Sequence, residues 1–375
     1  MRVLEYVGIL AASIGCLCSC VSLPAGHDAS PDTDLIATTG VLAKEKRKDG
    51  GIEFKRFPDY ILALYPAGKI RRNGKDRGFM VAGRKGRTTA CVKLYFKTAS
   101  KNIDMVFKIP DGYQNRGCDF RIYQNGKVWK DVKFPAKDKG GTLHIVSEHP
   151  GDSVLYTIAM PSWADPILYK MTLDDGAKLE PCQPPKRKLY VAYGDSVSHG
   201  TGQGSASYKT WPYILADLLG YDIHNLAIGG ASIKPDFMEV FKEFKRIDLI
   251  TIYIGINDAG NKTPAEFKKA YREMLETIRK YHPDTKIFCI SIHSVPEDKR
   301  GRRGKLVDYR QPVVDAVGER RATGDKNIYL VDGRKLVDIE DAMSPGNVHL
   351  SPEGAAKWAR NLYKIVKPVL DGDGK

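Results

Sequence analysis

The chain has 375 residues, of which 42% are hydrophobic and 28% are charged, so it is long enough for two globular domains with buried cores. Its 59 basic and 45 acidic residues give a net charge of +14, which attracts anionic partners. The basic residues lack the interleaved aromatic residues of nucleic-acid modules, so we expect no nucleic-acid partner. A basic soluble surface and an acidic glycan partner both stay open.

Residues 1–20 predict a targeting segment that is not part of the fold. The apolar run from Val7 to Leu17 is too short to span a bilayer. It leads into Leu17-Cys18-Ser19-Cys20, which resembles a bacterial lipobox, and lipidation of Cys20 would anchor the mature chain to a membrane surface. An ordinary cleaved signal peptide is the alternative. Both predict a secreted or cell-envelope protein, either free or as a periplasmic or outer-membrane lipoprotein.

The cysteines of the mature chain indicate no metal site. Of seven cysteines, Cys16 and Cys18 would leave with the targeting segment, and the rest fit no zinc spacing. We therefore expect neither a metal nor a cofactor. Cys91 and Cys118 lie in one predicted domain, where they either form a disulfide or remain buried thiols.

The first half of the mature chain predicts a β domain behind a tether. Residues 21–40 are rich in Ser, Pro, Asp, Ala and Thr, which is typical of disorder. Residues 41–178 contain short alternating runs between turn residues, and Asn125-Gly126 is a strong hairpin turn because both positions accept positive φ. Such strands indicate a jelly-roll-like β-sandwich. They are expected at Tyr60–Tyr65, Val92–Phe96, Ile103–Ile109, Phe120–Tyr123, Val128–Phe134, Thr142–Val146, Val154–Met160 and Leu168–Leu173.

The second half predicts an α/β domain. Residues 179–188 form a Pro-rich linker, and from 189 to 375 strands alternate with helices, which favours a parallel sheet covered on both faces. A capping box at Thr263–Glu266 begins one helix. Strands are expected at Leu189–Tyr193, Tyr221–Ala227, Asp248–Ile254, Lys286–Ile292 and Asn327–Val331, and helices at Trp211–Leu219, Ile233–Phe244, Gln311–Arg321 and from Ser351 onward.

Loops after these strands carry the residues suited to chemistry, at the edge where α/β sheets bind ligands. Gly194-Asp195-Ser196 follows the first strand, so the serine hydroxyl would leave the sheet beside a helix N-terminus. Asn225–Gly230 and Gly255–Asp258 follow the next two strands and offer backbone and amide donors. His349 stands in a loop before the last helix, and histidine titrates near neutral pH.

These four segments resemble the conserved blocks of the SGNH (GDSL-type) hydrolases, over about residues 189–370. The resemblance implies a flavodoxin-like, three-layer α/β fold with a five-stranded parallel sheet. It implies Ser196 as nucleophile, His349 as general base, and an oxyanion hole from the N–H groups of Ser196 and Gly230 and the side chain of Asn257. The β half, with Gly117–Phe120, resembles the β-sandwich of one bacterial branch and of jelly-roll-bearing carbohydrate esterases.

One position departs from the family pattern. The usual Asp three residues before the histidine is Gly346 in this chain, so the group that orients His349 is missing from its place. A main-chain carbonyl is one substitute, as in some carbohydrate esterases of the family. The carboxylates of Asp341, Glu340 or Asp332 are others. A catalytically degenerate, glycan-binding envelope protein is the remaining alternative.

The expected reaction is removal of a small acyl group, such as acetyl, from a polysaccharide. Loops 198–211 and 293–310 are polar, whereas a lipase or thioesterase would need an apolar groove for a long acyl chain. A dinucleotide site is not expected, because Ser205 replaces the third glycine of the fingerprint that begins at Gly200. The sequence leaves the sugar and the oligomeric state open.

Overall fold

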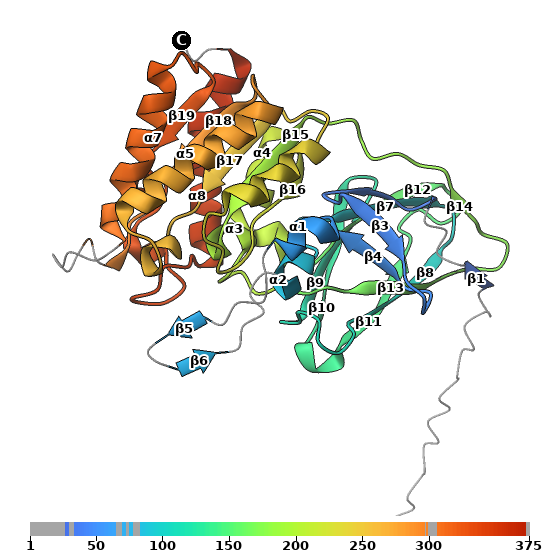
Figure 1. The fold of residues 1–375 in the computed structure, drawn as a ribbon. Coiled ribbons are helices and arrows are strands. Elements are labelled where there is room, and N and C mark those ends of the chain that lie inside the picture. Colours follow the sequence, from blue (N-terminus) through green and yellow to red (C-terminus); the bar gives the residue numbers. More distant parts are fainter. Residues whose placement is uncertain are drawn as a thin grey trace, which may run out of the picture.

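The computed structural model describes residues 27–29, 34–64, 70–72, 75–77, 83–296, 298 and 306–372. Antiparallel sheets form the N-terminal half and an α/β region forms the C-terminal half, joined by an extended segment between β14 and β15 (Figure 1). The predicted targeting segment, with Cys20, lies outside the described residues. Among the described helices, none combines the length and apolarity that crossing a bilayer requires.

The antiparallel region, which ends at Glu180, contains two large sheets. One has the order β11-β8-β13-β4-β3 with β1 beside β13, and the other β10-β9-β12-β7-β14 with β2 beside β7. Buried side chains of both sheets share one apolar core. The strands are β1 His27–Ala29, β2 Ala37–Thr39, β3 Ala43–Lys46, β4 Ile52–Lys55, β7 Lys93–Thr98, β8 Asn102–Lys108, β9 Cys118–Gln124, β10 Lys127–Phe134, β11 Gly140–Val146, β12 Val154–Ala159, β13 Ile167–Leu173 and β14 Leu179–Glu180, with β5 Ile70–Arg72 and β6 Lys75–Arg77 forming a separate ribbon.

Most expected strands of this region are found, and the hairpin turn is confirmed. Asn125 and Gly126 join β9 to β10 with φ of +46° and +79°. The expected strand at Tyr60–Tyr65 is wrong: Asp59–Ala63 is a short helix, α1, whose Ile61 packs into the core of the α/β region. Its start after Pro58, with Asp59 in the first turn, favours a helix. The jelly-roll connectivity stays a prediction.

Two segments expected to lie outside the β domain take part in its sheets. β1 and β2 fall within the predicted tether of residues 21–40 and pair with β13 and β7. β14 falls within the predicted linker of residues 179–188 and also pairs with β7. Backbone pairing at a sheet edge depends little on side-chain type, so composition alone did not indicate these short strands.

The α/β region has the predicted five-stranded parallel sheet. Its order is β16-β15-β17-β18-β19. This is the flavodoxin-like order, in which β15, the first strand along the chain, lies between β16 and β17. The strands are β15 Leu189–Gly194, β16 Asp222–Asn225, β17 Leu249–Tyr253, β18 Lys286–Ile290 and β19 Ile328–Val331.

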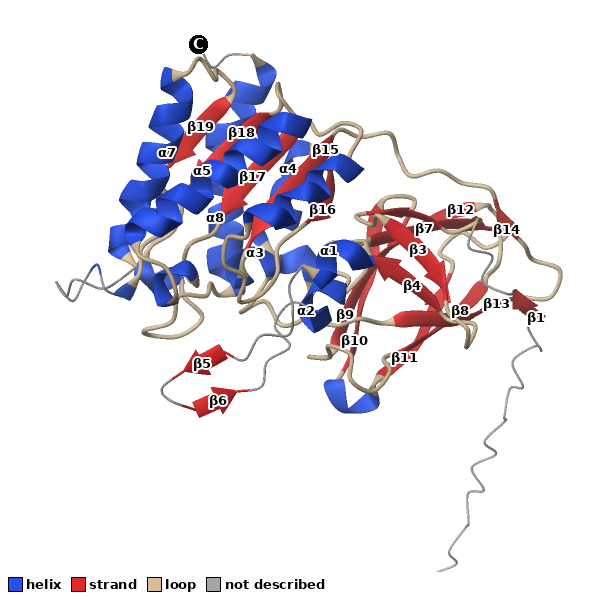
Figure 2. Cartoon of the chain, in the orientation of Figure 1, coloured by secondary structure: helices blue, strands red, loops and turns tan. Residues whose placement is uncertain are grey.

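Helices cover both faces of this sheet (Figure 2). α4 (Trp211–Leu219) and α8 (Pro352–Asp371) pack on one face, with Tyr190 and Ala192 of β15. The other face holds α5 (Pro264–Tyr281), α7 (Arg310–Ala322) and the 3₁₀ segment η3 (Pro235–Glu243), which replaces the α-helix expected at residues 233–244. The capping box is confirmed, since Thr263 and Glu266 bond reciprocally. The three-layer fold is therefore the predicted one.

Candidate active site

The loops that follow β15, β16 and β17 meet at one edge of the sheet. Pairing places Gly194 of β15 beside Tyr253 of β17, and Ala192 beside Asn225 of β16, so all three strands end together. The segments that carry Ser196, Gly230 and Asn257 therefore start from neighbouring points, as the sequence predicted.

Ser196 begins the short helix α3 (Ser196–His199) directly after β15. The carboxylate of Asp195 caps this helix by accepting a hydrogen bond from the N–H of Val197 at 3.0 Å. Burial raises the pKa of Asp195 to about 7. Gly194 fits only without a side chain, because a Cβ there would lie 2.5 Å from the carbonyl oxygen of Tyr253. The tight turn therefore fixes where the Ser196 hydroxyl leaves the sheet.

The hydroxyl of Ser196 meets the ring of His349. Ser196 Oγ and His349 Nε2 are 2.8 Å apart. The side-chain oxygen of Asn347 accepts from the backbone N–H and from Nδ1 of His349, both at 2.9 Å. Because the backbone N–H can only donate, the Asn347 atom facing it is oxygen, and Nδ1 must carry the ring proton. Nε2 is then the acceptor that can take the proton of Ser196.

Asn347 thus occupies the place for which carboxylates were expected, and the assignment to Asp341 or Asp332 is wrong. Asp341 accepts from Lys357 Nζ at 2.8 Å, and Asp332 from the Arg334 guanidinium at 2.7 Å. Cations hold both carboxylates away from the ring, while Asn347, two residues before His349, reaches it by folding back as an Asx turn. A main-chain carbonyl was the other expected partner of His349 Nδ1, and the side chain of Asn347 takes that place too.

The surroundings keep the His349 ring neutral. Burial lowers its pKa below the ordinary 6.5, and the nearby positive charge of Arg116 lowers it further. His293, which neighbours His349, is also kept neutral, since burial lowers its pKa to about 4. Its Nδ1 lies 2.5 Å from the hydroxyl of Tyr253. A neutral imidazole is the form that can accept a proton.

The expected oxyanion donors lie in ordered loops. Gly230 has φ of +87°, and the amide of Asn257 donates to the carbonyl of Ala231 at 3.0 Å, which leaves its second N–H for another acceptor. Within the described residues, the backbone N–H groups of Ser196 and Gly230 donate no hydrogen bond. Three donors are thus available on the loops that follow β15, β16 and β17.

The antiparallel region supports the Gly230 loop through His199. The N–H of Gly229 donates to His199 Nδ1 at 3.0 Å, so Nε2 carries the proton and donates to the carbonyl of Ser162 at 2.8 Å. The His199 ring stacks on Trp163 with centroids 4.0 Å apart. Burial lowers the pKa of His199 well below its ordinary value, which keeps the ring neutral, so that Nδ1 can accept the bond from Gly229. Ser162 and Trp163 follow β12, so the antiparallel region fixes the donor loop.

A buried arginine makes a second bridge. Arg56, which follows β4, is 0% exposed and donates to the carbonyl of Ala227 at 3.1 Å and to that of Asn225, in the loop after β16. It also donates to the carbonyl of Thr88 at 2.6 Å and to that of Gly86 at 3.3 Å, in its own region. Arg56 therefore links the antiparallel region by hydrogen bonds to the segment that precedes Gly229.

Sequence reasoning missed Asn347, His199, Trp163 and Arg56. An Asn two residues before the histidine is a local Asx-turn signal that points to Asn347. The other three act across the two regions and leave no local signal. Cys91 and Cys118 are buried free thiols, which decides between the two alternatives. In the described part of the chain, no group of three His, Cys, Asp or Glu side chains is placed to hold a metal ion.

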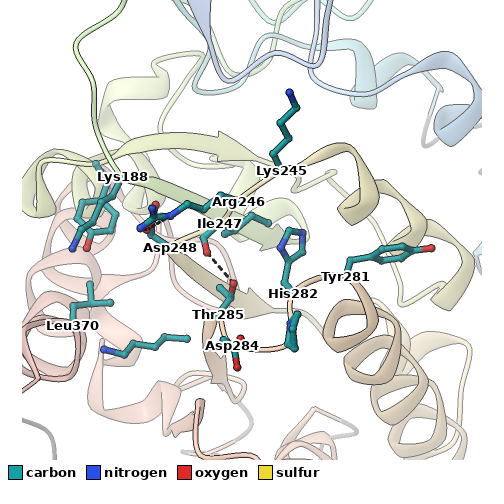
Figure 3. A pocket seen from close by; sticks show the side chains of 13 residues that line it. Lys188, Lys245, Arg246, Ile247, Asp248, Tyr281, His282, Asp284, Thr285 and Leu370 are labelled. Carbon is teal, nitrogen blue, oxygen red and sulfur yellow. Dashed lines mark hydrogen bonds and ion pairs between the residues drawn. The ribbon is translucent and has the colours of Figure 1, made fainter.

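A basic cavity of about 450 Å³ lies at the other edge of the sheet (Figure 3). It is lined by Lys188, Asp248 and Lys286, which stand at the amino ends of β15, β17 and β18. Since Ser196 follows the carboxyl end of β15, this cavity is separate from the candidate site.

A serine hydroxyl paired with an oriented imidazole, beside backbone donors at the carboxyl edge of a parallel sheet, is the arrangement of serine acyl hydrolases. Residues 192–357 match the family model of the GDSL-like lipases and acylhydrolases. This α/β region therefore belongs to the GDSL-like lipase/acylhydrolase family. No curated protein matches the chain.

Solved structures share the fold over most of the chain. Salicylyl-acyltransferase SsfX3 from a tetracycline biosynthetic pathway has a TM-score of 0.73 at 21% identity, with 92% of this chain and 98% of that one covered. A putative GDSL-like lipase from Bacteroides ovatus has 0.69 at 18%, with 91% and 96% covered. A family two carbohydrate esterase from Clostridium thermocellum in complex with cellohexaose has 0.61 at 16%, with 76% and 94% covered.

Proposed function

We propose that the protein is a serine esterase in which Ser196 is the nucleophile and His349 the general base. The observation that carries this proposal is the contact of 2.8 Å between Ser196 Oγ and His349 Nε2, with Asn347 holding the ring in the accepting tautomer. A paired base is what a serine hydroxyl requires to attack an ester at neutral pH.

The reaction would run through an acyl-enzyme. His349 takes the hydroxyl proton while Ser196 Oγ attacks the ester carbonyl, and the N–H groups of Ser196 and Gly230 with the amide of Asn257 stabilise the oxyanion. His349 then protonates the departing alkoxide. In the second half, His349 takes a proton from water, the hydroxide attacks the acyl carbon, and Ser196 leaves with the proton returned.

The proposed substrate is a polysaccharide that carries a small acyl group, with acetyl the first choice. The likeness to family two carbohydrate esterases, one of them bound to cellohexaose, is compatible with a glycan. A lipid or thioester is the alternative substrate within the same chemistry.

The test is hydrolysis of 4-nitrophenyl acetate by the mature chain and its Ser196→Ala variant. We expect the variant to lose at least about 10⁴-fold in kcat, the scale for loss of a serine nucleophile. Ser153→Ala, in an exposed turn before β12, is the matched control and should retain full activity. Acetylated polysaccharides would then be compared.

Absence of Ser196-dependent hydrolysis in folded protein would instead favour a non-catalytic glycan-binding protein. In that case the Ser196→Ala variant would bind glycan as well as the parent does. Binding lost in the variant without hydrolysis by the parent would contradict both assignments.

We also propose that the protein acts in the cell envelope, with Cys20 lipidated as its mature N-terminus. Support comes from the apolar run that leads into Leu17-Cys18-Ser19-Cys20. Membrane fractionation of the full chain and a Cys20→Ala variant tests this. Equal release of both into the soluble fraction would favour the ordinary signal peptide.

A further inference from the structure

The guanidinium of Arg116 is held in a fixed position at the surface of the antiparallel region. Its central carbon lies 3.8 Å from the centre of the Trp163 ring. The backbone N–H of Arg116 donates to the carbonyl of Trp163 at 3.0 Å, so the stacking residue also fixes its backbone. Arg116 is exposed, and within the described residues no carboxylate pairs with its side chain. It is an accessible, pre-oriented cation.

Trp163 places this cation beside the loop that carries Gly229 and Gly230. The ring also contacts His199 and the backbone of Gly229, where an added Cβ would lie 2.2 Å from the indole. Gly229 directly precedes Gly230, a proposed oxyanion donor. The charge of Arg116 also reaches His349, whose pKa it lowers. Arg116 therefore lies on the ring that supports the donor loop, and its charge acts on the proposed base.

A second cation contacts the Gly229–Gly230 loop from another part of the chain. Lys85 of α2 (Gly83–Arg87) donates from Nζ to the carbonyl of Gly229 at 2.9 Å. Burial lowers the pKa of Lys85, and repulsion from Arg116 lowers it further. The charges of Arg116 and Lys85 both add to the local positive potential, which favours an anion.

We propose that Arg116 is the anchor of a carboxylate-binding subsite, so that the preferred ester substrate carries a carboxylate close to its scissile acyl group. This inference rests on the proposed esterase function and deepens it. The planar guanidinium can bind a carboxylate through two parallel hydrogen bonds, and stacking on Trp163 reduces the entropy lost when it does. Lys85 adds to the potential through its charge.

The carboxylate can come from the glycan, as in an O-acetylated uronate, or from the acyl group, as in a succinyl ester. Two pairs of substrates separate these sources. Acetylated galacturonan is compared with acetylated xylan from which uronate side groups have been removed. 4-Nitrophenyl succinate is compared with 4-nitrophenyl acetate. In one pair or the other, we expect the parent enzyme to prefer the anionic member by about tenfold or more in kcat/KM.

The variant Arg116→Gln tests the anchor itself. We expect the anionic-to-neutral ratio of kcat/KM to fall about tenfold for the preferred pair, with Arg116→Lys intermediate because it keeps the charge but loses the planar fork. Arg187→Gln removes the same charge from the amino end of β15, at the opposite edge of the sheet, and should leave the ratio unchanged. An equal ratio in the parent and in Arg116→Gln would overturn the inference.

A binding measurement keeps the test independent of catalysis. In the Ser196→Ala background, calorimetry with oligogalacturonate and with xylo-oligosaccharide, or with succinate and acetate, reports the subsite directly. Binding of the anionic member that weakens with added salt and is lost in Ser196→Ala/Arg116→Gln supports the subsite, even where the parent shows no hydrolysis. Preference for the neutral members in an active esterase would overturn this inference and leave the proposed function standing.

Discussion

The two partners of the Ser196–His349 pair are supported in different ways. The serine side, with the Gly229–Gly230 loop, is held by buried contacts that cross between regions, through His199, Trp163 and Arg56. The histidine side is held mainly by its own loop, in which Asn347 reaches back to the ring and Met343 bonds to His349. The difference teaches that the antiparallel region fixes the donor loop of the proposed site, whereas the ring of His349 is oriented from its own loop.

Packing explains this asymmetry. The residues that fix the donor loop are nearly inaccessible, with Arg56 and His199 both 0% exposed and Trp163 1%. Residues 343–346 before His349 are exposed. Changes on the serine side should therefore disturb stability and catalysis together, whereas changes on the histidine side should act on catalysis with little effect on stability.

The largest expected effect is that of Arg56→Met. It would leave the carbonyls of Thr88, Asn225 and Ala227 buried without their donor, so we expect the free energy of unfolding to fall by at least about 3 kcal/mol. Urea denaturation measures this loss. The control Arg246→Met removes an exposed ion pair with Asp248 and should cost less than about 1 kcal/mol. Similar losses in both variants would show that Arg56 does not bridge the regions.

Next is Gly229→Ala. The added methyl would lie 2.2 Å from the Trp163 ring, so either the ring or the donor loop must move. We expect kcat to fall about 10²–10³-fold, the cost of losing one oxyanion donor. Gly318→Ala is the control, because nothing lies within 4 Å of its Cβ in α7. Unchanged kcat in a stable Gly229→Ala protein would remove the Gly229–Gly230 loop from the proposed oxyanion hole.

Local sequence signals predicted most of the fold and the serine side of the site. The alternation of β15, β17 and β18 with helices predicted the parallel sheet, and its strand ends predicted the clustering of Ser196, Gly230 and Asn257. The prediction of the sheet rests on periodicity, and the prediction of the clustering rests on contacts set by neighbouring strands. Tyr60–Tyr65 was predicted wrongly because its apolar residues pack against the α/β core instead of a sheet.

The supports of the site could not be predicted in the same way. Trp163 and His199 meet across 36 residues of chain, and Arg56 reaches Asn225 across 169, so no spacing rule connects them. Asn347 was missed for another reason. The search for an orienting group considered carboxylates and a main-chain carbonyl, whereas a neutral amide oxygen accepts from Nδ1 equally well in geometry.

Substitutions of Asn347 should change catalysis through the orientation of His349. Asn347→Ala removes the acceptor from Nδ1, and we expect kcat to fall about 10²-fold with the free energy of unfolding within about 1 kcal/mol of the parent. Asn347→Asp keeps the oxygen and adds charge, which stabilises the imidazolium and should retain activity while raising the pKa of His349. Steady-state kinetics with 4-nitrophenyl acetate and urea denaturation measure both. A stability loss as large as that of Arg56→Met would contradict the asymmetry.

The smallest expected effect is in the pH profile. His349 must be neutral to accept a proton, and burial with the charge of Arg116 lowers its pKa, so kcat/KM should persist as the pH falls past 6.5 and decline only below it. Arg116→Gln removes the second cause, and Asn347→Asp adds an opposing charge, so both should move this acid limb to higher pH. The profile is measured with the neutral substrate 4-nitrophenyl acetate, which excludes titration of the substrate. An acid limb at or above 6.5 in the parent would mean that the ring is more solvated than its contacts indicate, and that the histidine loop opens in solution.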